Sequence, residues 1–189
     1  MSDLSLQMDA FSHNVVAKVT EAFPDDILAV GYFRDELTIV VGRDNLPDVC
    51  TFLRDEPELR FNVLTDLSAV DMLPEHPRFE VNVQLLALRR DAQPGQGTRR
   101  VRLKVRLEEA DARMPTLTGV WPSSAWYERE TRELFGIEFD QLADARPLLL
   151  PEDWEGTPPM RRDVPVLVEE VAFSFNRERI DRGKSYAKE

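Results

Sequence analysis

Apolar residues recur along the chain with two different periods, and the longer period predicts three helices. From Met8 to Ala22 the apolar positions are three or four residues apart, which is typical of an amphipathic helix that ends before Pro24. Residues 46–53 repeat this spacing. Residues 123–135 form the third predicted helix, because Gly136 suits the left-handed position at which a helix ends.

Alternation of apolar and polar residues with a period of two predicts the strands. They are expected at residues 27–33, 37–41, 61–70, 79–88 and 100–107. The last is the most regular, with four apolar residues on one face and four basic residues, Arg100, Arg102, Lys104 and Arg106, on the other. This basic face is either solvated or meets an acidic neighbour.

The order of these elements predicts an α+β fold. A helix, two strands, a helix, three strands and a helix follow one another with short connections, which favours a mainly antiparallel sheet with helices packed on one face. We assign residues 1–139 to this domain. Residues 140–189 contain five prolines and predict an extended arm that lies on another surface.

Charge and hydropathy narrow the class of protein. The 189-residue chain has a formal net charge of −11, of which −10 falls in residues 1–75. An acidic first part argues against a nucleic-acid partner, because phosphates repel it. No apolar run approaches the roughly 20 residues that span a bilayer, and residues 1–10 do not resemble a signal peptide. We therefore expect a cytoplasmic protein, unless a partner holds it at a membrane.

The sequence contains few candidate residues for catalysis, metal binding or nucleotide binding. The single cysteine, Cys50, lies in an apolar pattern and is predicted to be buried, whereas His13 and His76 are predicted at the surface. No zinc, nucleotide-phosphate or activated-serine motif is present. Asp66 and Asp71 could be imagined as an acid–base pair, but nothing in the sequence places them at a cleft. We expect no intrinsic catalytic role.

The most informative stretch runs from Trp121 to Pro165. Its helix combines aromatic residues with dense, balanced charge. The spacing predicts surface pairs four residues apart, namely Glu128 with Arg132 and Arg129 with Glu133. An arginine between acids is equally typical of a buried polar junction, in which a guanidinium bridges carboxylates.

Here the chain resembles the thirty-kilodalton subunit family of respiratory complex I, which in bacteria is the C subunit of NADH:quinone oxidoreductase. The resemblance covers about residues 60–165. The chain differs from the usual pattern of this family at Leu142, where a histidine is usual, and at Pro147, where an arginine is usual. The matching positions, which we take as candidate residues for contact with other subunits, are Glu128, Arg129, Glu130, Glu133, Phe135, Gly136, Arg146, Asp153, Trp154, Gly156, Arg161, Arg162 and Asp163.

The resemblance implies a non-catalytic peripheral-arm subunit of a proton-pumping NADH:quinone oxidoreductase. Electron transfer from NADH to quinone would belong to the assembly, and FMN, iron–sulfur clusters and quinone would be held by partner subunits. The implied partners are the large quinone-module subunit and its iron–sulfur neighbour, on the cytoplasmic side of the plasma membrane. The domain would pack on the large quinone-module subunit and the arm would wrap across it, with Trp154, Arg161 and Arg162 as anchors; the alternative for Trp154 is that it folds back on its own domain.

Two other classes stay open at this point. One is the equivalent subunit of a membrane-bound hydrogenase-type or other non-NADH complex, which also contains chains of this family. The other is a free-standing small enzyme. Neighbouring genes for hydrogenase subunits, rather than for NADH-oxidising subunits, would indicate the first class. Activity or a bound chromophore in the purified chain would indicate the second.

Overall fold

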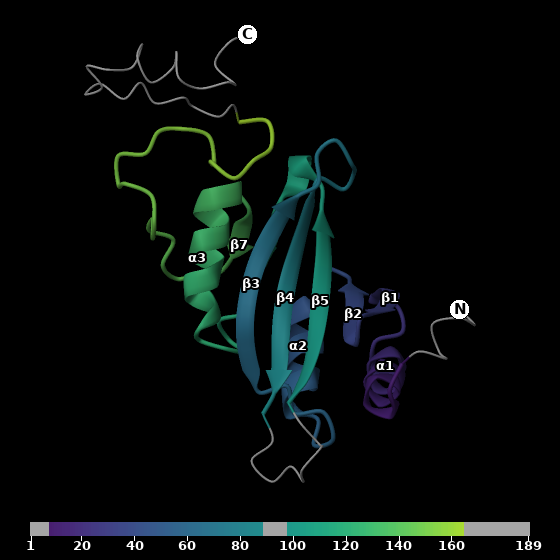
Figure 1. Cartoon of the computed structure of the whole chain (residues 1–189). Helices are drawn as coiled ribbons and strands as arrows, with labels where there is room; N and C mark the ends of the chain where they lie inside the picture. The colour runs from purple at the N-terminus through teal and green to yellow at the C-terminus, as the bar shows by residue number, and fades with distance from the viewer. Residues whose placement is uncertain (1–7, 89–97, 165–189) are drawn as a thin grey trace, which may run out of the picture.

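A five-stranded sheet organises the residues that the computed structural model describes, which are 8–88 and 98–164 (Figure 1). The strands β2 and β5 are parallel, and every other neighbouring pair is antiparallel. The predicted α+β fold with a mainly antiparallel sheet is confirmed. In spatial order the strands are β1 (Ile27–Phe33), β2 (Glu36–Val41), β5 (Arg99–Leu107), β4 (Phe79–Ala87) and β3 (Val63–Asp71).

The core lies between one face of this sheet and two helices, α1 (Ala10–Ala22) and α2 (Leu46–Asp55). Figure 1 shows α2 behind β4 and β5. The alternating apolar side chains of β4 and β5 are buried there, as their period of two requires. Cys50 of α2 is buried among them, as predicted, and burial raises the pKa of its thiol. His13 and His76 are exposed, which also confirms the prediction.

The basic side chains of β5 lie on the opposite face of the sheet, and two of them pair closely with acids of neighbouring strands. Arg102 binds Glu36 of β2 at 2.7 Å, and Lys104 binds Glu80 of β4 at 2.7 Å. These cross-strand pairs satisfy part of the basic face inside the sheet itself. A contact of this face with an acidic neighbour stays a prediction.

The helix α3 (Ser124–Phe135) lies along the outer edge of β3 rather than over the face of the sheet (Figure 1). The Tyr127 hydroxyl donates a hydrogen bond to the Thr65 carbonyl at 3.0 Å, and the Thr131 hydroxyl donates to the Leu67 carbonyl at 3.4 Å. An uncovered edge strand offers such carbonyls to foreign strands. The helix therefore closes one edge of the sheet.

Three short elements were not predicted. They are the 3-10 helix η1 (Glu109–Asp111) and the strands β6 (Arg113–Pro115) and β7 (Glu138–Asp140), which pair in parallel. Three residues are too few to display a period. The domain boundary expected between residues 139 and 140 falls inside β7, and an independent arm stays a prediction.

Residues 141–164, which we call the C-terminal segment, contain turns and bends but no helix or strand. In Figure 1 the segment runs along the side of α3 that faces away from the sheet, and then crosses the end of this helix. The rest of the expected arm, residues 165–189, lies outside the described residues. Within residues 8–88 and 98–164, no helix has the length and apolar character needed to cross a bilayer.

Candidate functional site

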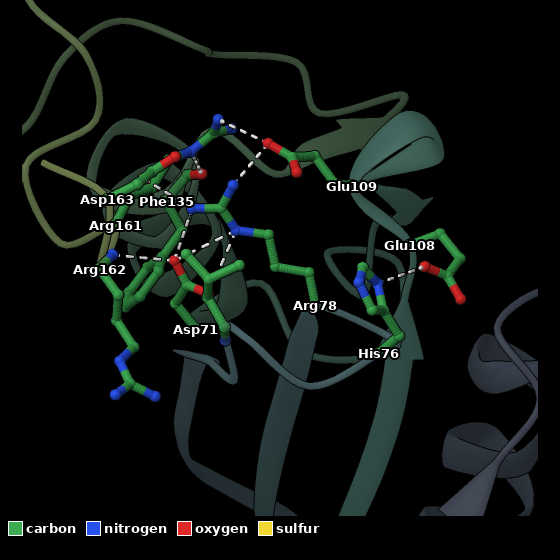
Figure 2. A network of polar contacts seen from close by, with 10 residues as sticks. Asp71, His76, Arg78, Glu108, Glu109, Phe135, Arg161, Arg162 and Asp163 are labelled. Carbon is green, nitrogen blue, oxygen red and sulfur yellow. Dashed lines mark hydrogen bonds and ion pairs between the residues drawn. The ribbon is translucent and has the colours of Figure 1, made fainter.

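A buried arginine, Arg78, gathers polar groups at the end of the sheet where β3 stops and β4 starts (Figure 2). Its side chain is only 2% exposed. The register of the two strands places Asp71 opposite Phe79, so the Asp71 carboxylate lies beside the Arg78 guanidinium. Nε of Arg78 donates to both Asp71 oxygens at 3.2 Å, and Nη2 donates to Oδ2 at 2.8 Å.

Two further carboxylates complete what we call the Arg78 cluster. Glu109 of η1 accepts from Nη1 of Arg78 at 2.5 Å, and Asp163 of the C-terminal segment accepts from Nη2 at 2.7 Å. The backbone N–H of Arg162 also donates to Asp71, at 2.9 Å. The cluster therefore fastens the C-terminal segment to the sheet. Across the described part of the chain, no group of three or more His, Cys, Asp or Glu side chains is placed to hold a metal ion.

The electrostatics of the cluster favour the charged forms of Asp71, Asp163 and Arg78. Burial by itself would raise the pKa of Asp71, but the hydrogen bonds from Arg78, Arg162 N–H and Leu73 N–H outweigh burial and lower this pKa to about 2. The hydrogen bond from Arg78 likewise lowers the pKa of Asp163. The pKa of Arg78 is raised, because its guanidinium donates hydrogen bonds to the three carboxylates.

Arg161 makes a second attachment of the C-terminal segment, at the end of α3. Its Nε donates to the Phe135 carbonyl at 2.7 Å, and its guanidinium lies over the Phe79 ring, 5.4 Å from the centroid. Gly136, which directly follows Phe135, ends α3 with a φ of 72°, as predicted. A Cβ at Gly136 would lie 2.6 Å from Nη2 of Arg161. Glycine is favoured here by the left-handed backbone, and a side chain at this position would also force the end of the Arg161 side chain to shift.

Glu133 and Arg129 hold the first half of the C-terminal segment. The Glu133 carboxylate accepts from the N–H groups of Leu148 and Leu149, each at 2.8 Å. Arg129 donates to the carbonyls of Arg146 and Pro147, each at 2.9 Å. Because this segment has no strand or helix partner, its backbone polar groups need such side chains.

Glu128 points the other way, into the protein, and is fully buried. Its two carboxylate oxygens accept from Leu117 N–H at 2.7 Å and from the Thr116 hydroxyl at 2.6 Å. Glu128 therefore fixes the loop before α3. The predicted surface pair Glu128–Arg132 is wrong, as is the pair Arg129–Glu133, because tertiary partners outcompete neighbours on the same helix. Arg132 instead pairs with Glu138, at 2.9 Å.

The remaining motif residues lie nearer the surface. The Trp154 indole donates to the Gly156 carbonyl at 3.0 Å, and a Cβ at Gly156 would meet the indole ring at 2.8 Å. Arg146 pairs with Asp144 at 2.8 Å, and Asp153 is exposed. The other two are Glu130, which is partly buried, and Arg162, whose guanidinium points away from the Arg78 cluster in Figure 2. Leu142, which differs from the usual pattern of the family, is partly buried and packs against the core.

Sequence reasoning missed the role of Arg78 and Glu109. A signal for Arg78 was present, since this arginine directly precedes the alternating residues of one predicted strand while Asp71 directly follows the preceding predicted strand. An antiparallel pairing of the two would bring the residues together. Glu109 offered no such signal, because η1 was not predicted.

Acid is expected to destabilise the protein between about pH 4 and pH 2 through Asp71. The folded-state pKa of about 2 lies below the ordinary value of 3.8, so the stability that Asp71 contributes is complete above that value and is lost as the pH falls through 2. Urea unfolding at several pH values measures how the free energy of unfolding changes with pH. This change between about pH 4 and pH 2 should be smaller in Asp71→Asn than in the wild type. Asp48→Asn, which changes an exposed carboxylate of α2, should keep the wild-type change. Equal changes in all three proteins would contradict the prediction.

Known proteins match this chain over most of its length. The family model described as "Respiratory-chain NADH dehydrogenase, 30 Kd subunit" matches residues 39–170. The NADH-quinone oxidoreductase C subunit of Roseiflexus sp. (strain RS-1) is 44% identical over 175 residues, which are 93% of this chain and 96% of that protein. The corresponding C subunit of Geobacter sulfurreducens is 37% identical over 158 residues, which are 83% of this chain and 91% of that protein.

Solved structures agree with these matches. A trypsin-resistant fragment of Nqo5 superimposes with a TM-score of 0.57 and 27% identity, covering 71% of this chain and 98% of the fragment. A chain of an archaeal membrane-bound sulfane sulfur reductase has a TM-score of 0.66 at 23% identity, covers 82% of this chain and 86% of its own length, and shares the fold. The resemblance found in the sequence is thus confirmed, and the chain belongs to the family of the 30 Kd subunit of the respiratory-chain NADH dehydrogenase.

Proposed function

We propose that this chain is a non-catalytic peripheral-arm subunit of a proton-pumping NADH:quinone oxidoreductase, in which it scaffolds the quinone-reducing module. The observation behind this proposal is the match of nearly the whole chain to C subunits of NADH-quinone oxidoreductases, including the motif that surrounds α3. Electron transfer from NADH to quinone then belongs to the assembly. FMN, iron–sulfur clusters and quinone are held by partner subunits.

The geometry of the motif supports a scaffold rather than an active site. Glu128, Glu133 and Arg161 each bind backbone groups of this same chain. These contacts order the loop before α3 and the segment after it, which gives the molecule a fixed outer surface beside the sheet. A fixed surface lowers the entropic cost of assembly. The partners that we propose are the large quinone-module subunit and its iron–sulfur neighbour.

Affinity purification of the full-length tagged chain from its native organism tests this proposal. We expect subunits that contain FMN and iron–sulfur clusters to co-purify, together with NADH:quinone reductase activity. The purified chain alone should show neither activity nor a chromophore. Co-purification of hydrogenase-type subunits instead would assign the chain to a sister complex, and activity in the isolated chain would overturn the scaffold role.

Location at the cytoplasmic side of the membrane is part of the same proposal. In right-side-out vesicles the chain should resist added protease, whereas in inverted vesicles it should be cleaved. Washing with a chaotropic salt should release it without detergent, as expected for a peripheral subunit held through other proteins.

A further inference from the structure

The two edges of the five-stranded sheet differ. The edge at β3 is covered by α3, whereas β1 forms the other edge and, within residues 8–88 and 98–164, pairs with β2 alone. None of the seven residues of β1 is buried. A Cβ added at Gly31 would meet no other atom of the described residues within 4 Å. The space beside this strand is therefore open.

The composition of β1 does not protect this edge. Residues 27–33 include no charged residue and no proline, which are usual features of edge strands that avoid pairing with other chains. The bulge of the strand lies at its start, between Ile27 and Ala29. Leu28 is 64% exposed and Phe33 is 72% exposed. Such an edge is typical of a site at which another strand is added.

The pairing of β1 with β2 determines which backbone groups face outward. The two turn residues 34–35 have φ values of 51° and 62°, which is typical of a two-residue hairpin. In such a turn Glu36 N–H donates to the Phe33 carbonyl. Alternate residues of an antiparallel strand face the same neighbour. Val30 and Tyr32 therefore direct their backbone N–H and C=O groups to the open edge.

A second copy of β1 complements this edge when two antiparallel strands are centred on Val30. Val30 then faces Val30 of the second copy and Tyr32 faces Leu28, so that outward backbone groups meet one another. Phe33 faces Ile27 of the second copy. Both exposed apolar side chains of the strand, Leu28 and Phe33, thus gain an apolar cross-strand partner. Because the arrangement has two-fold symmetry, each of these unlike pairs occurs twice.

Charges at the ends of the strand favour the same register. Asp26 of one copy faces Arg34 of the second copy, and opposite charges that face each other across two strands attract. A shift of two residues in either direction loses this pair. Asp25 and Asp35 also face one another, but both are exposed, so water and salt screen their repulsion.

We propose that two copies of the free chain associate through β1 as an antiparallel pair centred on Val30, which joins the two sheets into one. The occupant of the open edge is thus a second copy of this chain. The net charge of −11 on each copy opposes association and the contact is small, so we expect a dissociation constant of about 10–100 µM. This association concerns the chain outside any complex and does not rest on the proposed function.

Disulfide formation tests the register. Val30→Cys should link more than about half of the chains after mild oxidation, because facing residues of a hydrogen-bonded pair have Cα atoms about 5.5 Å apart. Leu28→Cys is the matched control. Leu28 is more exposed than Val30, but its two copies would lie about 13 Å apart, too far for a disulfide. The native Cys50 is buried and should not react.

Sedimentation equilibrium of the full-length chain tests the association itself. At about 0.3 M salt, which screens the net charge, the average mass should rise from monomer toward dimer between about 1 and 200 µM. Phe33→Asp should raise the dissociation constant by about tenfold or more, because a carboxylate replaces an apolar cross-strand partner. Val70→Asp, which changes an exposed residue of β3 near the opposite edge, should associate like the wild type.

Several results would overturn the proposal. They are a wild type that stays a monomer at about 200 µM, equal linking of Val30→Cys and Leu28→Cys, and unchanged association of Phe33→Asp. If the wild type is a monomer and the thiol of Leu28→Cys resists alkylation only in the purified complex, another subunit covers β1 instead. Both aspartate variants should melt within about 3 °C of the wild type. If Phe33→Asp does not fold, the comparison of the two cysteine variants decides.

Discussion

Replacing Arg78 with methionine is expected to lower the free energy of unfolding by about 3–5 kcal/mol, which is typical when one partner of a buried ion pair is removed. The substitution leaves the Asp71 carboxylate, 1% exposed, without its guanidinium partner. It also removes the hydrogen-bond donors to Glu109 and Asp163, but these two acids are about half exposed, so their share of the loss is small.

The same substitution should also weaken the attachment of the C-terminal segment to the sheet. Asp163 is attached to the sheet through Arg78, so the variant should be cut by trypsin near residues 161 and 162 faster than the wild type. Urea unfolding of the full-length chain measures the loss of stability, and the time course of digestion measures the release of the segment. The free energy of unfolding of Arg78→Lys should lie between that of the wild type and that of Arg78→Met. A lysine ammonium keeps the charge but lacks the planar guanidinium that binds three carboxylates.

Arg106→Met is the matched control. Arg106 lies on β5, and its side chain is 55% exposed and 3.7 Å from Glu80, so its removal should cost less than about 1 kcal/mol. If Arg78→Met unfolds at the same urea concentration as this control, the Arg78 cluster does not stabilise the fold.

Replacing Glu128 with alanine is expected to cost about 3 kcal/mol, since hydrogen bonds to a charged group contribute about 1.5–3 kcal/mol each. Both oxygens of this buried carboxylate are occupied, one by Leu117 N–H and the other by the Thr116 hydroxyl. The alanine variant leaves the Leu117 N–H buried without an acceptor. Leu117 itself is fully buried, so the loop cannot move into water without exposing its side chain.

Glu128→Gln should cost about 1 kcal/mol, because the amide oxygen still accepts from Leu117 N–H and the Thr116 hydroxyl can turn to accept from the amide. Glu130→Ala serves as the control on the same helix, since Glu130 is only partly buried and should change stability by less than about 0.5 kcal/mol. Thermal or urea unfolding of the three variants is the measurement. A loss in Glu130→Ala as large as that in Glu128→Ala would show that helix content, and not the buried carboxylate, determines the effect.

Local patterns in the sequence were enough to predict the class of fold, the order of its main elements and the family. Periods of two and of three to four residues reflect which face of a strand or helix is buried, and this information is local in the chain. It was sufficient for α1, α2, α3 and the five strands of the sheet, and for the burial of Cys50. It was not sufficient for β6 and β7, which are three residues each and exist because they pair with one another.

The roles of the charged residues of α3 depend on packing between distant parts of the chain. Local spacing predicted pairs along the surface of the helix, yet Glu128 binds a loop eleven and twelve residues earlier, and Glu133 binds backbone groups fifteen and sixteen residues later. A buried carboxylate satisfies a backbone N–H that has no other partner, and this gain exceeds that of a solvated pair on a helix surface. The Arg78 cluster has the same origin in part: the pairing of β3 with β4 brings Asp71 to Arg78, whereas Glu109 and Asp163 reach Arg78 only through packing between distant parts of the chain.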